Sequence, residues 1–392
     1  MNFTFKTIAF LFLFTSQWAT GQTTVPTINF IPDANFAPSA DWDAHLPPIP
    51  DTGSARKIYS DIAVARDGRF FLIERKSKSI LRFDAQGEYL GRFGGEGNKA
   101  HQFKNVPPSQ IKIVDQRYLV VNTGQWGRLS IFNLEGEYLK EIKLDYPIRR
   151  FRVLPQNRLL ILGWIMLKDG GYRDHVAILN LETQKTEKIT HFEQKATTTI
   201  KNDKRVIGLH MSPGAGSTYI LTTGEGDILI SHSDTREIQR YQGATLMDTF
   251  TLPLSRPAIS DADVKQYRTS AEEALKQLKL PDSTYVRIAA TDFLSKPHPY
   301  YYHLETLPGH RLLAFILHEG SERRCHVLLL ENTGRSLGEH VLSIDGYDPP
   351  YLSRGASHIT FNGEWMYALV TKTRGGEKHF SIIRAREQTP GR

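Results

Sequence analysis

Three histidines, in separate parts of the chain, are the residues best suited to chemistry. His210, His303 and His358 stand in GLHMSPG, YYHLETLPG and SHITFNG, each shortly before a predicted turn. Three imidazoles that converge can bind zinc and leave one coordination position open for a substrate. The sequence therefore predicts a site for a divalent metal such as Zn or Ca if these side chains meet. The alternative is that they are ordinary polar residues, which their unequal spacing to the next glycine favours.

Aromatic residues form a second group of candidates. The stretch KPHPYYYH, at 296–303, carries three consecutive tyrosines: Tyr300, Tyr301 and Tyr302. Each combines an apolar ring with a polar tip, which suits sugar stacking or protein contact. Trp126, in TGQWGRL, is also a predicted ligand-binding residue, and Trp164 stands at the matching place of the following repeat. The structural alternative is that alternate tyrosines enter a sheet core and that the tryptophans pack between sheets.

Other motifs for catalysis are incomplete. The glycine-rich FGGEGNKA, at 93–100, lacks the Gly-Lys-Ser/Thr of a phosphate cradle and a following helix, so it is interpreted as a loop. Ser212 lies near His210, but no G-x-S-x-G elbow accompanies it. Cys325 is the single cysteine and stands in an apolar run, which is typical of a small buried residue. Asp61 is interpreted as a strand-entry residue with a structural role.

The elements that must position these residues are repeated short strands. FDAQGEYLGRF (83–93) is nearly repeated as FNLEGEYLKEI (132–142), and each copy closes a unit of four apolar-alternating segments. The period of two fits strands and no helix. More divergent copies follow at 149–192, 217–254, 301–344 and 357–385. Six such units predict an all-β, six-bladed β-propeller of four-stranded antiparallel blades, with Phe83 and Phe132 in the core between blades.

The N-terminal segment is expected to close this ring, which spans 61–387. The last unit shows three strands before the chain ends, so one strand is missing. We expect the segment 22–60 to supply it, through Thr27–Phe30 in the sequence TINF. Residues 388–392 are interpreted as a tail.

A short helical insertion is predicted between the fourth and fifth blades, at about 255–300. The stretch SAEEALKQLKL, at 270–280, opens with a Ser-x-x-Glu capping box, and Pro281 ends it. We expect the insertion to lie on one face of the ring.

The N-terminus predicts export. Lys6 precedes the apolar run IAFLFLF, and small residues stand before a cut between Gly21 and Gln22, so residues 1–21 have the pattern of a signal peptide. No later segment is apolar enough to span a membrane. The net charge of +7 comes from basic residues interleaved with acidic ones, which does not fit a nucleic-acid-binding arm. We expect a periplasmic or secreted monomer.

The stretch DGRFFLIERKSKSILRFDAQGEYLGRFGGEG resembles an NHL-type repeat, in which one strand ends in Phe-Asp-x-x-Gly and the next in Phe-Gly-x-x-Gly. More broadly, the chain resembles the exported six-bladed β-propeller proteins of Bacteroidetes-like bacteria. The first two units match in motif and the last four in outline. The resemblance implies the fold, and for most members of the family no activity is assigned.

Two functions follow from these observations. The first is a non-catalytic binding or scaffold module, without a cofactor, for a protein, peptide or glycan on one loop face. The alternative is a metal-dependent lyase or hydrolase with a His-lined site in the central channel, a plan that some NHL-type lyases resemble. A third interpretation is a carbohydrate-active propeller. Convergence of the three histidines distinguishes the first two.

Overall fold

The regular secondary structure of the chain is almost all β-strand, with 3% helix. The computed structural model describes residues 25–37, 40–50, 58–104, 106–124, 126–167, 172–194, 197–202, 205–211, 216–256, 260–261, 265, 269, 299–316, 325–348 and 359–388. The predicted signal peptide and the predicted helix at 270–280 lie outside these residues, as does most of the insertion. Within the described ranges, no helix has the length and hydropathy needed to cross a membrane.

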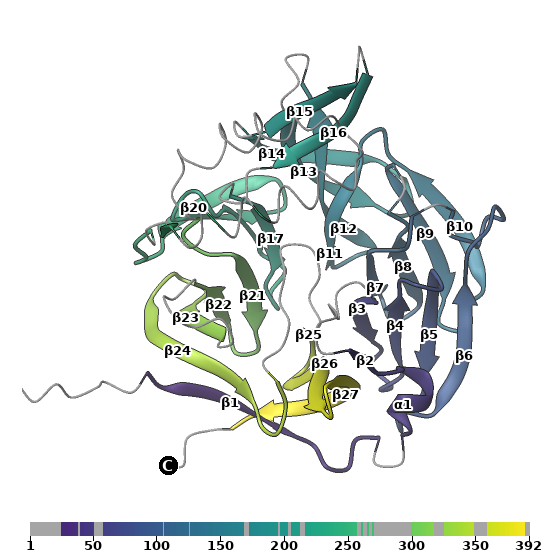
Figure 1. Cartoon of the computed structure of the whole chain (residues 1–392). Helices are drawn as coiled ribbons and strands as arrows, with labels where there is room; N and C mark the ends of the chain where they lie inside the picture. Colours follow the sequence, from purple (N-terminus) through teal and green to yellow (C-terminus); the bar gives the residue numbers. More distant parts are fainter. Residues whose placement is uncertain are drawn as a thin grey trace, which may run out of the picture.

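The described strands include four antiparallel sheets of four strands, each in chain order (Figure 1). The first sheet is β3 (Tyr59–Val64), β4 (Phe70–Glu74), β5 (Ser79–Phe83) and β6 (Tyr89–Gly94). The second is β7 (Gln110–Val114), β8 (Tyr118–Asn122), β9 (Arg128–Asn133) and β10 (Tyr138–Lys143). The third is β11 (Ile148–Leu154), β12 (Arg158–Met166), β13 (Tyr172–Asn180) and β14 (Thr186–Gln194). The fourth is β17 (Thr218–Thr222), β18 (Ile228–His232), β19 (Glu237–Gln242) and β20 (Thr245–Thr251).

The remaining strands form a larger sheet and a hairpin. The fifth group is β21 (His303–Leu307), β22 (Arg311–Phe315), β23 (Cys325–Glu331) and β24 (Ser336–Ile344). The last group is β25 (Ile359–Asn362), β26 (Trp365–Arg374) and β27 (Glu377–Glu387). β1 (Thr27–Pro32) joins these two groups into one sheet, and β2 (Ile49–Pro50) pairs with β27 as its ninth strand. β15 (Thr197–Asn202) pairs with β16 (Arg205–Met211), and the short helix α1 covers Trp42–His45.

The sheets stand around a common centre, as the blades of a β-propeller do (Figure 1). The first strand of each group lies nearest to that centre: β3, β7, β11, β17, β21 and β25. Hydrophobic clusters fill the spaces between neighbouring groups, so that each sheet is covered on both faces. The predicted core positions are confirmed, since Phe83 and Phe132 are both fully buried in such clusters.

β1 pairs with one strand of the fifth group and with one strand of the last group. It pairs antiparallel with β27 through Phe30–Pro32, and it also pairs parallel with β24 through Thr27–Phe30, which was not anticipated. Just after β1, Asp33 forms an ion pair with Arg384 of β27. The N-terminal segment thus ties the fifth group to the last one.

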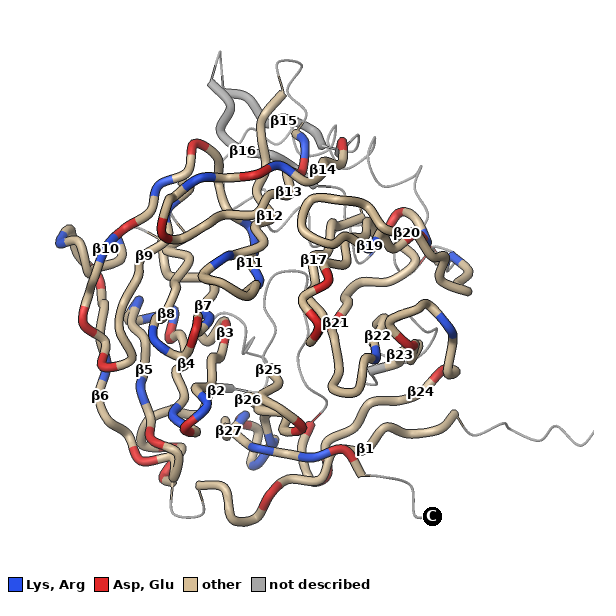
Figure 2. The backbone as a smooth tube through the Cα atoms, turned by 180° about the vertical axis from the view of Figure 1, so that it is seen from behind, with Lys and Arg blue, Asp and Glu red and all other residues tan. Residues whose placement is uncertain are grey.

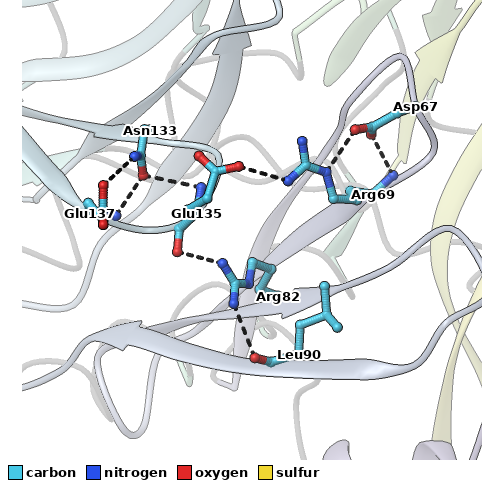
Figure 3. Close-up of polar contacts among 7 residues, drawn as sticks. All are labelled: Asp67, Arg69, Arg82, Leu90, Asn133, Glu135 and Glu137. Atoms are coloured by element: carbon cyan, nitrogen blue, oxygen red, sulfur yellow. Dashed lines mark hydrogen bonds and ion pairs between the residues drawn. The ribbon is translucent and has the colours of Figure 1, made fainter.

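In the second sheet, the turn between the third and fourth strands is stabilised by the polar side chain at its start. The Asn133 side-chain carbonyl accepts the N–H groups of Glu135 and Glu137, at 3.1 and 2.7 Å (Figure 3). Two arginines of the first sheet also bind this turn of the second sheet. Arg69 Nη1 lies 3.1 Å from the Glu135 carboxylate, and Arg82 donates to the Glu135 carbonyl (Figure 3). The turn therefore orients one sheet against the next as well as reversing the chain.

The glycine of the same turn allows a neighbouring blade to approach closely. Gly136 has a φ of +89°, and a Cβ atom there would lie 2.6 Å from the ring of Phe93 on the preceding sheet. Gly87 repeats the arrangement, with a φ of +85° and a Cβ position 2.4 Å from that of Ala37. Glycine is thus needed here both for backbone conformation and for packing.

Replacing Gly136 by alanine should lower the free energy of unfolding by about 2–4 kcal/mol, because overpacking adds to left-handed strain. The matched control is Gly95→Ala, where φ is +85° but nothing lies within 4 Å of the new methyl group. In Gly95→Ala the free energy of unfolding should fall only by the cost of backbone strain, about 1–2 kcal/mol. Urea unfolding followed by tryptophan fluorescence measures both, and equal losses in the two variants would contradict the packing role.

Candidate functional site

A β-bulge in β11 decides where its consecutive arginines point. Ile148 pairs with Gly163 and Arg150 pairs with Leu162, so Arg149 is an inserted residue. Ile148 and Phe151 both pack toward the second sheet. Since side chains alternate along a strand, Arg150 and Arg152 face the fourth sheet instead. The bulge therefore directs two guanidinium groups toward β17 and β21. All three strands lie near the centre of the ring (Figure 2).

Arg152 links three innermost strands. Its Nε donates to the carbonyl of Ile220 on β17 at 3.2 Å, and its Nη2 lies 3.2 Å from Glu305 Oε2 on β21. Both side chains of this pair are largely buried, at 16% and 12% exposure. Burial by itself would raise the pKa of Glu305, but Arg152 and His303 outweigh it and hold the pKa at about 2. Glu305 is therefore a carboxylate at neutral pH.

A second buried ion pair joins β3 to β7. Lys112 Nζ lies 3.1 Å from the Asp61 carboxylate, which also accepts the N–H of Ile111 at 3.0 Å. Burial raises the pKa of Asp61, while Lys112 and Ile111 oppose the change. Asp61 thus has a role in the centre of the ring rather than only at the entry to a strand. We call Asp61, Lys112, Arg150, Arg152, Tyr219, His303 and Glu305 the axial cluster.

His303 lies in this cluster without a good hydrogen bond. Its side chain is 2% exposed, and its ring packs edge-on against Tyr219 and Phe315. Nε2 is 3.5 Å from Glu305 Oε2, and neither ring nitrogen has a hydrogen-bond partner in the described part of the chain. Burial, assisted by Arg150 and Arg152, lowers the pKa of His303 despite Glu305. The imidazole is neutral at pH 7.

The other two predicted metal ligands are not placed beside it. His210 belongs to β16, which pairs with β15 in a two-stranded sheet and not with any innermost strand. The side chain of His210 and the whole of His358 lie outside the described residues. Among the residues that are described, no group of three or more His, Cys, Asp or Glu side chains could hold a metal. Convergence of the three histidines stays a prediction.

Trp126 does lie on a surface with other aromatic side chains. It is 59% exposed, and its ring meets that of Trp164 edge-on at 5.5 Å. Trp164 in turn meets Tyr172 edge-on at 6.2 Å, and Arg149 stacks over Tyr172 at 4.6 Å. Arg149 is fixed by Asp174 at 3.1 Å. The four ring and guanidinium groups Trp126, Trp164, Tyr172 and Arg149 form what we call the aromatic platform.

The three consecutive tyrosines have different environments. Tyr301 has no exposed surface, and its hydroxyl contacts that of Ser231, so it is a core residue and the predicted ligand-binding role does not apply to it. Tyr300 is half-buried with Arg256 over its ring at 4.8 Å, and Tyr302 is half-buried against Phe315 at 6.1 Å. The alternative interpretation, that alternate tyrosines enter the core, holds for Tyr301.

Of the axial cluster, only His303 was expected in the central channel from the sequence. The sequence feature that could have revealed the cluster is a set of charged residues inside strands predicted to be innermost, as in IRRFRVL and HLETL. The platform was anticipated in part, through Trp126 and Trp164. Both groups lie at the same edge of the ring, because in an antiparallel meander the connection between second and third strands and the entry to the first strand share one edge. We call this edge the loop face.

The sequence matches no protein-family model, and it matches no curated protein. The fold is similar to that of a protein from Bacteroides fragilis described as exported, at 11% identity and a TM-score of 0.47 over 93% of this chain and 100% of that chain. It is similar to a DUF4221 family member from Bacteroides vulgatus, at 10% identity and 0.45 over 87% and 96%. A third similar structure is virginiamycin B lyase from Staphylococcus aureus, at 11% and 0.41 over 87% and 98%. At these low scores we draw no functional conclusion from them.

Proposed function

We propose that this chain is an exported six-bladed β-propeller with NHL-type repeats that binds a protein or peptide on its loop face without chemical conversion. Six hydrophobic clusters, each shared by two neighbouring groups of strands, support the six blades. The closing strand β1 supports a complete ring. Export is supported by the signal-peptide pattern at 1–21.

The observation that carries the binding role is the exposure of Trp126. The indole of Trp126 is 59% exposed, and exposing such an apolar ring to water is unfavourable. Its orientation is nevertheless fixed by contact with Trp164. Apolar neighbours extend the surface: Ile165 and Met166, both 41% exposed, follow Trp164 on β12. Trp, Met and Arg are enriched in protein interfaces. This composition favours a protein or peptide over a glycan, since sugar sites add more polar hydrogen-bonding groups.

The test is selection of peptides from a random phage-displayed library on the chain without residues 1–21. Trp126→Ala should weaken binding of a selected peptide by at least about tenfold, as expected for an interface anchor. Met247→Ala, which removes an equally exposed side chain (57%) from the fourth sheet, should leave it unchanged. Equal binding by the Trp126 variant, or binding on a glycan array alone, would overturn the proposal.

A metal-dependent lyase or hydrolase at the centre of the ring is the second candidate. What favours it is the neutral, buried imidazole of His303, 3.5 Å from a carboxylate. His210 and His358 would be the further ligands. Metal analysis of the purified chain and of a His303→Ala variant tests this candidate: about one equivalent of metal, lost in the variant, is required by it.

A further inference from the structure

The axial cluster contains one positive charge that has no counter-ion. Lys112 is paired with Asp61 and Arg152 with Glu305. The guanidinium of Arg150 is half-buried, and no carboxylate or hydrogen-bond acceptor among the described residues contacts it. Its recorded neighbour is the ring of Tyr219, 5.2 Å away. Three basic side chains, Lys112, Arg150 and Arg152, thus stand beside two carboxylates, Asp61 and Glu305.

A charge in this position is costly unless something binds it. Removing a guanidinium from water is unfavourable, and a cation–π contact with one tyrosine offsets only part of that cost. Burial lowers the pKa of Arg150 to about 10, which still leaves it charged at neutral pH. The bulge at Arg149 is what aims Arg150 away from the solvent and toward β17. A bound anion would offset this cost.

The imidazole of His303, which also lies beside Tyr219, indicates the same kind of ligand. The ring centroid of His303 lies 6.0 Å from that of Tyr219, so His303 and Arg150 both border this side chain. An imidazole carries at least one N–H in either protonation state, yet neither nitrogen of the buried His303 has a hydrogen-bond partner among the described residues. A buried donor of this kind is normally satisfied. The same anion could accept from both groups.

We propose that Arg150, His303 and Tyr219 form a binding site for the carboxylate of a small organic monoanion, at the loop-face end of the ring axis. The planar fork of a guanidinium matches the two oxygens of a carboxylate. One unpaired charge balances a monoanion, whereas a phosphate dianion would meet Glu305 and Asp61 without enough positive charge. The rings of Tyr219 and Phe315 both pack edge-on against His303.

The test uses benzoate as the carboxylate probe and inorganic phosphate as the competing one. Titration calorimetry on the chain without residues 1–21 should show saturable benzoate binding at one site, with phosphate binding at least about tenfold more weakly. Arg150→Met should weaken benzoate binding by at least about tenfold. The control Arg117→Met, at an exposed arginine that also stacks on a tyrosine, Tyr118, should not change it.

The stability of the Arg150 variant separates a binding role from a structural one. If the charge serves a ligand, Arg150→Met should be at least as stable as the wild type without benzoate, since it removes an uncompensated buried charge. If Arg150 serves packing alone, the variant should be less stable and wild-type benzoate binding should be absent.

His303→Phe, which keeps the ring and loses the N–H, is a second test and should weaken binding several-fold. Equal binding of phosphate and benzoate would overturn the carboxylate assignment. These results do not depend on Trp126, so they are distinguishable from a failure of the peptide-binding proposal.

Discussion

Replacing Phe30 by alanine should lower the free energy of unfolding by about 3–5 kcal/mol, the usual cost of deleting a fully buried aromatic ring. Phe30 is 2% exposed and packs in the cluster shared by the fifth group and the last. It is also the residue at which β1 changes from its pairing with β24 to its pairing with β27. Loss of this ring therefore weakens both contacts that close the propeller.

The neighbouring residue supplies the control for this experiment. Ile31 lies on the same strand and is 42% exposed, so Ile31→Ala removes apolar atoms without opening the core. Its effect should stay within about 0.5 kcal/mol. Urea unfolding by fluorescence and circular dichroism gives both values. Similar losses in the two variants would show that β1 contributes through its backbone pairing and not through Phe30.

Arg152→Met should cost about 3–5 kcal/mol, because it leaves the Glu305 carboxylate buried without its main partner. The double variant Arg152→Met/Glu305→Leu should recover most of that loss, since neither charge of the pair then remains. Additive losses in the double variant would contradict the pairing. The measurement is the free energy of unfolding of the wild type, both single variants and the double variant.

The same pair predicts a pH dependence. Glu305 has a pKa of about 2 in the folded chain, below its ordinary value of 4.5. A carboxyl whose pKa is lowered by folding contributes its full stabilisation above the unfolded value and loses it as the pH falls toward the folded one. The wild type should therefore lose stability between about pH 4.5 and pH 2. In the Glu305→Leu background that part of the pH dependence should disappear.

Hydrogen bonds from side chains to backbone join the innermost strands around the ring. At five junctions a side chain on or beside one innermost strand bonds the backbone of the next: Asp61 to Ile111, Gln110 to Phe151, Arg152 to Ile220, Tyr219 to Tyr302 and Asn362 to Ala65. The five side chains are of five types. The same kind of side-chain-to-backbone hydrogen bond thus recurs between innermost strands, although no repeated sequence motif predicts it.

Local patterns in the sequence predict most of the strands and their order. Apolar alternation and turn glycines are local properties, so the first two units were predicted within a few residues, and TINF was identified as the segment expected to close the ring. The hairpin β15–β16 was not predicted, because its polar residues, such as Thr198 and Lys201, carry no clear apolar alternation.

Which side chains meet depends on the tertiary structure. One inserted residue, Arg149, shifts the register of β11 and separates its own side chain from those of Arg150 and Arg152, which face the fourth sheet. Tyr301 enters the core while its two neighbours do not, because a strand entry fixes alternate side chains on opposite faces. The axial cluster combines residues from five innermost strands that are far apart in sequence. Such convergence depends on how whole sheets stack around an axis, and no local pattern records it.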